Sequence, residues 1–215
     1  MPQQTKIFRV FVSSTFTDMK EERRILQRDV FPKLEKFCES KGAKFQAVDL
    51  RWGVNEESQL NQKTLDICLN EVARCQRISP KPNFLILLGN KYGWQPIPSK
   101  ILATEMNQIL TKLSAEHKTL INQWYKLDKN AIPEEYVLQP RGEQYKEYDA
   151  WSPVENKIRD ILRGAVSKLP FSPQQQVKYF ASATHQEIIN GALHPPEGAE
   201  KPEEHVFALL RNIDG

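Results

Sequence analysis

The sequence lacks the glycine-rich loops that cradle phosphate groups. Neither GxxxxGK[ST] nor GxGxxG follows any apolar run, and glycine supplies only 9 of the 215 residues. The GxSxG turn that presents a nucleophilic serine is missing as well. Because such turns bring backbone N–H groups or a serine directly to a ligand, their absence argues against P-loop hydrolysis, ordinary dinucleotide binding and serine-hydrolase chemistry.

Cysteine is scarce and has no pairing pattern. The three cysteines, Cys38, Cys68 and Cys75, show neither CxxC nor Cys/His ligand spacing. They are interpreted as buried or free thiols in a reducing compartment, and no residue cluster predicts a metal site.

The chain also lacks a charge excess and a long apolar run. Its 30 basic and 27 acidic residues leave a net charge of +3 without a Lys/Arg-rich segment, so nucleic acid is not indicated as a partner. No apolar run approaches the roughly 18 residues of a membrane span, and the first residues do not resemble a signal peptide. We expect a cytoplasmic chain without a membrane partner.

The stretch from Lys6 to Lys20, KIFRVFVSSTFTDMK, changes abruptly from apolar to polar. Its first half is a near-continuous run of β-favouring residues, which is typical of a parallel strand buried on both faces. Hydroxyl residues begin at Ser13, and a charged helical pattern follows from Asp18. Because ligands of open α/β sheets bind where strands end and turn into helices, we expect a site here.

Three further apolar runs are separated by helical spacing. They predict strands over 43–50, 84–88 and 206–210, and the periodic stretches between them predict helices over 18–40, 61–77 and 182–193. Strands that alternate with helices favour a parallel sheet with right-handed crossovers. The predicted fold class is therefore α/β, with a parallel sheet flanked by helices.

A block at about 99–176 departs from this alternation. Helical spacing holds over 102–124 and 156–169, whereas 128–153 is rich in proline, tyrosine and glutamate and predicts an irregular surface excursion. A short extended segment is expected at 177–180. We therefore expect one domain over the whole chain, with a helical insertion before the last helix and strand, as part of a longer protein.

Polar and aromatic residues gather where the predicted strands end. The candidates for binding are Ser13, Ser14, Thr15 and Phe16 after the first strand, Arg51, Trp52 and Gly53 after the second, and Tyr92 and Trp94 after the third. Arginine suits a phosphate and indole rings stack on a flat base, while Glu187 in the late helix suits ribose hydroxyls. Structural roles are also open: the hydroxyl residues suit a helix cap, the tryptophans suit packing at loop bases, and Arg51 suits an ion pair.

Glu187 has two interpretations from spacing alone. Thr184-His185-Gln186-Glu187 matches the [ST]xx[DE] capping box, in which the acid returns to the first amide of its own helix. Alternatively, the carboxylate lines a cleft at the ends of the strands.

Several segments resemble a known family. FRVFVSSTFTDMKEER, FQAVDLRWGV and LLGNKYGWQP, in this order, are similar to the TIR-like domain at the N-terminus of many STAND-class NTPases, including NACHT and WD-repeat proteins and telomerase-associated protein relatives. The later SATHQEI and VFALLRNID fit the same pattern. The resemblance covers about 6–96 and 178–214 and leaves the block between them unmatched.

The resemblance implies a fold and an activity. TIR-like domains have a flavodoxin-like sheet with strands near the order 2-1-3-4-5, and their enzymatic members cleave NAD at the nicotinamide–ribose bond with a glutamate that matches Glu187. NAD would then be a substrate and not a cofactor. The family also implies a defence or signalling role, self-association, and NTPase and sensor domains in the same longer chain. A non-catalytic oligomerisation module and a nucleoside deoxyribosyltransferase-like enzyme remain alternatives.

Overall fold

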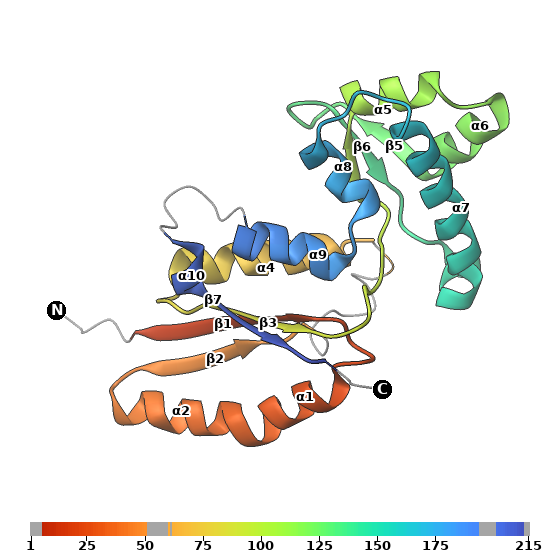
Figure 1. Cartoon of the computed structure of the whole chain (residues 1–215). Coiled ribbons are helices and arrows are strands. Elements are labelled where there is room, and N and C mark those ends of the chain that lie inside the picture. The colour runs from red at the N-terminus through yellow and green to blue at the C-terminus, as the bar shows by residue number, and fades with distance from the viewer. Residues whose placement is uncertain (1–5, 51–59, 61, 194–200, 213–215) are drawn as a thin grey trace. The chain divides into compact units, whose positions relative to one another are not determined.

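Four apolar segments form one parallel sheet in the computed structural model, which describes residues 6–50, 60, 62–193 and 201–212 (Figure 1). The strands are β1 (Ile7–Ser14), β2 (Lys44–Val48), β3 (Phe84–Leu88) and β7 (Val206–Leu210). They lie in the order β2-β1-β3-β7, so β1 is an inner strand. The predicted α/β fold with a parallel sheet is confirmed, and the strand order agrees with a flavodoxin-like arrangement.

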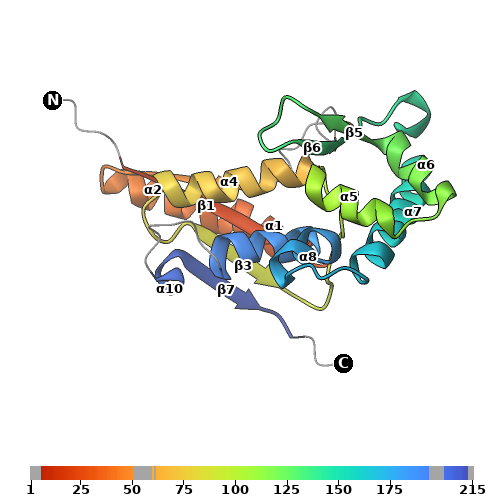
Figure 2. The same cartoon turned by 90° about the horizontal axis from the view of Figure 1, so that it is seen from above.

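Helices cover both faces of this sheet (Figures 1 and 2). One face carries α1 (Lys20–Ile25), the π-helical turn Leu26–Val30 and α2 (Phe31–Ser40). The other face carries α4 (Thr64–Ile78), α9 (Ala183–Ile188) and the π-helical turn Ile189–Leu193, and the short α10 (Pro202–His205) precedes β7. Pro32, which predicted a kink or a junction of two helices, lies in the first turn of α2, where a missing N–H costs little.

The two faces of the sheet bury separate apolar clusters. Phe11 and Phe84 pack toward α4, whereas Val12 and Leu87 pack toward α1 and α2. Because successive strand residues point to opposite faces, Phe11 and Val12 set the direction of the residues that follow. Ser13 therefore continues the α4 face.

A second compact unit comprises residues 55–66 and 95–181, and the first unit takes the remainder of the chain. The small antiparallel sheet of the second unit has the strand order β4-β6-β5. The strands are β4 (Lys100–Leu102), β5 (Tyr125–Asp128) and β6 (Glu135–Leu138), and the helices are α5 (Ala103–Thr111), α6 (Ala115–Trp124), α7 (Tyr148–Val166), α8 (Pro173–Phe180) and the 3-10 helix Glu143–Tyr145. In the core of the second unit, the rings of Trp124 and Trp151 pack edge to face, with their centroids 4.6 Å apart.

The structure corrects three expectations for this block. It is not wholly helical, because short strands occupy part of the region expected to be irregular. The stretch 102–124 is two helices, since Ser114 caps α6 by accepting a hydrogen bond from His117 N. Residues 177–180 are helical, because Ser172 and Gln175 form a capping box that starts α8. The division into one domain with an insertion stays a prediction.

Within the described ranges, none of the helices combines the length and the apolar character that crossing a bilayer demands.

Candidate active site at the end of the first strand

The polar end of β1 is buried. Ser13 is 0% exposed and Ser14 is 4% exposed, and both remain paired with β3 through Ile86 and Leu87. Buried hydroxyl groups require hydrogen-bond partners, so the partners of these two serines define the chemistry of the site. The two side chains leave the strand on opposite faces, as strand alternation dictates.

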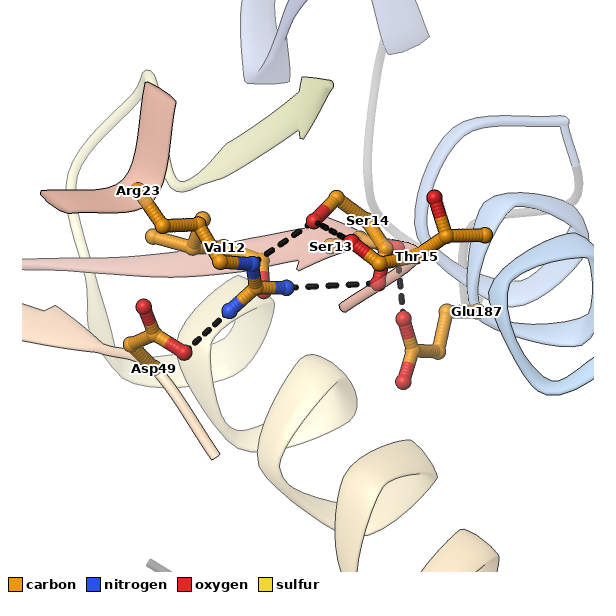
Figure 3. Close-up of polar contacts among 7 residues, drawn as sticks. All are labelled: Val12, Ser13, Ser14, Thr15, Arg23, Asp49 and Glu187. Atoms are coloured by element: carbon orange, nitrogen blue, oxygen red, sulfur yellow. Dashed lines mark hydrogen bonds and ion pairs between the residues drawn. The ribbon is translucent and has the colours of Figure 1, made fainter. Parts of the chain in front are cut away.

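Ser13 meets Glu187 of α9. Its Oγ donates to Glu187 Oε2 at 2.5 Å, across 174 residues of sequence (Figure 3). The N-cap of α9 is Ser182, the residue before Ala183, and its Oγ accepts a hydrogen bond from His185 N at 3.2 Å. Thr184 and Glu187 therefore do not cap this helix. The capping-box interpretation of Glu187 is therefore wrong. The strand and the helix instead bring the predicted acid to the predicted strand end.

Burial sets the charge of Glu187. The residue is 7% exposed, and loss of hydration raises the pKa of its carboxyl to about 7. Hydrogen bonds from Ser13 and the Cys68 thiol of α4, and the positive charge of Arg23, act in the opposite direction and lower that pKa. Burial also raises the pKa of Cys68, and the neighbouring Glu187 raises it further. The thiol therefore stays protonated and serves as a donor to the carboxylate.

Ser14 points to the other face, where Arg23 of α1 is buried. Arg23 Nε donates to Ser14 Oγ at 2.6 Å, and its guanidinium also pairs with Asp49, which directly follows β2 (Figure 3). Its guanidinium carbon lies 5.0 Å from the centre of the Phe16 ring. The end of β1 is thus held from both faces.

The segment after β3 lies close to the same strand end. Gly93 has φ +88°, and a Cβ there would lie 2.8 Å from Thr15 Cγ2, so only glycine permits this approach. Ala183 N donates to Trp94 O at 2.8 Å, which joins this segment to the start of α9. Tyr92 shares a 2.8 Å hydrogen bond between its hydroxyl and His185 Nδ1.

The structure brings some of the predicted site residues together and separates others. Ser13 contacts Glu187, whereas Ser14 contacts Arg23, and Thr15 donates to Asp18. Phe16, Tyr92 and Trp94 are exposed by 48%, 51% and 42%. The Phe16 ring nevertheless faces the Arg23 guanidinium, and the Tyr92 ring meets the His185 ring edge to face. Arg51, Trp52 and Gly53 lie outside the described residues.

Sequence reasoning missed Arg23, Cys68 and His185. Arg23 stands in the charged run KEERR, which is typical of a solvated helix face, and its burial depends on Asp49 in a distant segment. Cys68 is a buried thiol, as the sequence suggests, but nothing in its local sequence indicates that it lies beside Glu187. In the sequence His185 stands only within the capping-box motif, and its partner Tyr92 lies 93 residues away, so no local signal marks it.

The arrangement suits carboxylate chemistry. Among the described residues, no three His, Cys, Asp or Glu side chains gather in a way that would hold a metal ion. A desolvated carboxylate with a pKa near neutrality exerts a strong field on a positive charge that develops beside it.

Comparisons with known proteins place the chain among multidomain relatives. Residues 9–150 match the profile of a family described as Domain of unknown function (DUF4062). The chain is 33% identical over 201 residues to the Mus musculus NACHT domain- and WD repeat-containing protein 1, covering 91% of this chain and 12% of that protein. For the Homo sapiens NACHT and WD repeat domain-containing protein 2, the identity is 32% over 200 residues, with coverages of 84% and 12%.

A shorter match is found to the Rattus norvegicus Telomerase protein component 1, with 40% identity over 88 residues, 41% of this chain and 3% of that protein. The chain thus spans only a small part of the relatives it matches. No solved structure matches it significantly. Ser13 lies within the residues matched by the family profile, and Glu187 lies beyond them.

Proposed function

The chain belongs to the DUF4062 family, and from that premise we propose that it is a TIR-like effector domain that hydrolyses NAD at the nicotinamide–ribose bond when several copies assemble. The observation that carries the proposal is the hydrogen bond between Ser13, at the end of β1, and Glu187 of α9. A carboxylate at the end of an inner parallel strand occupies the place where ligands of open α/β sheets bind.

Glu187 has a simple task in this reaction. Cleavage of the N-glycosidic bond leaves positive charge on the ribose, and nicotinamide, which is cationic in NAD, departs as a neutral base without needing a proton. Water then adds to the ribose, giving nicotinamide, ADP-ribose and a proton. The carboxylate stabilises the ribosyl cation and binds ribose hydroxyls, while Ser13 holds its orientation.

Assembly has a physical purpose in the proposal. Glu187 is 7% exposed, so ribose reaches its carboxylate only when the residues packed around it move. Contacts between copies supply the energy for that movement, and the isolated domain at low concentration is expected to turn over slowly. The exposed rings of Tyr92 and Trp94 then receive the base.

Nicotinamide release tests the proposal directly. Artificially clustered protein is incubated with NAD, and Glu187→Gln is compared with Glu116→Gln, a matched change at an exposed carboxylate that pairs with Lys157. We expect Glu187→Gln to lower the rate by about 100-fold or more, because one lost electrostatic contact costs several kcal/mol of barrier. Glu116→Gln should retain the wild-type rate. Absence of nicotinamide release under every clustering condition would remove the proposal.

The relatives suggest the setting of the domain. Two of them are named for NACHT and WD repeat domains, and the chain covers 12% of each. We propose that this chain is likewise one domain of a longer STAND-type protein with a defence or signalling role, in which the NTPase and sensor domains control clustering.

A non-catalytic assembly module is the second candidate, and the outer strand β7 favours it. Phe207, Leu209 and Leu210 are exposed by 62%, 56% and 71%, although an α/β sheet ordinarily covers such residues. As the last strand of the described sheet, β7 presents backbone groups that suit antiparallel pairing with the same strand of a second copy. This candidate requires self-association without any nicotinamide release.

A further inference from the structure

Arg23 is a buried cation at the end of β1 that the proposed chemistry leaves without a role. The residue is 2% exposed. Beyond its bond to Ser14 Oγ, its Nη2 lies 3.3 Å from the carbonyl oxygens of both Val12 and Ser14. Its Nη1 pairs with Asp49, whose side chain is 3% exposed. One guanidinium therefore joins α1, the end of β1 and the residue after β2 (Figure 3).

Burying the Arg23–Asp49 ion pair costs free energy of desolvation, which the attraction between the two charges does not always repay. Removing a guanidinium and a carboxylate from water is offset only when the geometry is good and the remaining donors are satisfied, and an apolar pair of similar volume is often as stable. What a buried pair provides is a fixed arrangement, since the planar fork of arginine accepts few geometries. Here the fixed part is the two-residue strand end that bears Ser13.

We infer that Arg23 is a positioning residue, which holds Ser14 from the α1 face so that Ser13 meets Glu187 on the opposite face. The inference rests on the proposed NAD-cleaving function, because it assigns Arg23 to the same reaction. The backbone of β1 couples the two faces. Ser13 and Ser14 share one rigid peptide unit, so a shift of Ser14 moves the Ser13 hydroxyl by a similar amount.

Arg23 also influences the charge of the acid. The groups that act on Glu187 are Ser13 of β1, Cys68 of α4 and Arg23 of α1, and only Arg23 is positively charged. Its charge lowers the pKa of Glu187, against the burial that raises it. Loss of the guanidinium must therefore raise the pH at which Glu187 ionises, whereas an ammonium at the same place must largely preserve it.

Three variants separate positioning from simple packing. Arg23→Gln removes the charge and the fork, Arg23→Lys keeps the charge, and Arg28→Gln removes an exposed cation of the same helical run that pairs with its neighbour Asp29. If Arg23→Gln does not fold, Arg23→Gln combined with Asp49→Asn removes both buried charges and leaves neither unpaired. Each variant is assayed for nicotinamide release by clustered protein across pH.

We expect Arg23→Gln to lower kcat by up to about 100-fold with little change in KM, because Glu187 is misplaced in the transition state while most of the binding surface stays intact. Its rate should also rise at a higher pH than that of the wild type. Arg23→Lys should restore the pH of that rise but only part of kcat, and Arg28→Gln should match the wild type. Equal kcat losses in Arg23→Gln and Arg23→Lys, with no change in the pH profile, would overturn the inference.

A second readout does not depend on enzyme activity. The ¹³C signal of the Glu187 carboxyl, assigned by its loss in Glu187→Gln, is followed by NMR as pH is varied. A midpoint that rises in Arg23→Gln and returns in Arg23→Lys supports the inference even if NAD is never cleaved, in which case only the proposed function fails. A midpoint that is unchanged in Arg23→Gln refutes the inference even if NAD is cleaved.

Discussion

At the residue scale, Glu187 is a carboxyl group whose protonated form is favoured by the fold. Burial raises its pKa from the ordinary 4.5 to about 7, in spite of Ser13, Cys68 and Arg23. The folded state consequently binds a proton more tightly than the unfolded state. The stabilisation from that proton is complete below pH 4.5 and is lost as pH rises through about 7.

This linkage predicts a pH-dependent difference between the wild type and Glu187→Gln. Glutamine imitates the protonated acid and does not titrate, so the variant should gain stability relative to the wild type between pH 4.5 and 7. The gain should level off above pH 7 at a value on the order of 3 kcal/mol. Urea unfolding of both proteins at a series of pH values measures it. A difference that is constant from pH 4 to 8 would show that Glu187 is not held in this environment.

The same residues show what the sequence could predict. Ser13 and Glu187 were candidates from the chain itself, as the polar end of the first strand and an acid of the late helix, and the resemblance added the catalytic role of Glu187. The structure places the two residues in contact. Ser14 was predicted beside Ser13 but faces α1, because the face of each serine depends on which strand residues contact which helices. The burial of Arg23 was not predictable, since it requires knowing that Asp49, directly after β2, lies next to α1.

At the element scale, the approach of the β3 end to the β1 end depends on Gly93. Its φ of +88° and the 2.8 Å distance from a built Cβ to Thr15 Cγ2 both oppose any side chain, and Thr15 is held in place by Asp18. Gly42 shares the positive φ, at +71°, but has open space around it. A side chain at Gly42 would therefore meet only backbone strain, whereas a side chain at Gly93 would meet both backbone strain and a steric clash.

Alanine at these positions should give unequal losses of stability. Gly42→Ala should cost about 1 kcal/mol from its positive φ alone. Gly93→Ala should cost a further 1 to 3 kcal/mol, roughly, because Thr15 has little room to move. Chemical denaturation of both variants measures the difference. Equal losses would mean that the segment after β3 does not pack against Thr15 as described.

The caps of two helices offer a second test at this scale. Ser182 caps α9, which carries Glu187, and Ser114 caps α6, which has no part in the site. Replacement of either serine by alanine should cost about 1 kcal/mol of stability. Only Ser182→Ala should also slow nicotinamide release, because it loosens the helix that positions the acid. A similar slowing in Ser114→Ala would argue against this role of α9.

At the scale of the whole molecule, strands with long, continuous apolar runs could be predicted from the sequence, and shorter strands could not. The strands of the parallel sheet were found because runs such as FLILL are unbroken and are separated by helical spacing. The small sheet was missed because β5 and β6 have only four residues each, too few to establish a period, in and beside a stretch rich in tyrosine and glutamate. Two short strands of that kind are stabilised by pairing that local sequence does not record.

The most direct measurement is the rate of nicotinamide release from NAD by clustered protein as a function of pH, for the wild type and for Glu187→Gln. The account predicts a wild-type rate that rises as Glu187 ionises, with a midpoint near pH 7, and a rate at least about 100-fold lower in Glu187→Gln at every pH above that midpoint. A Glu187→Gln rate within tenfold of the wild type would contradict it.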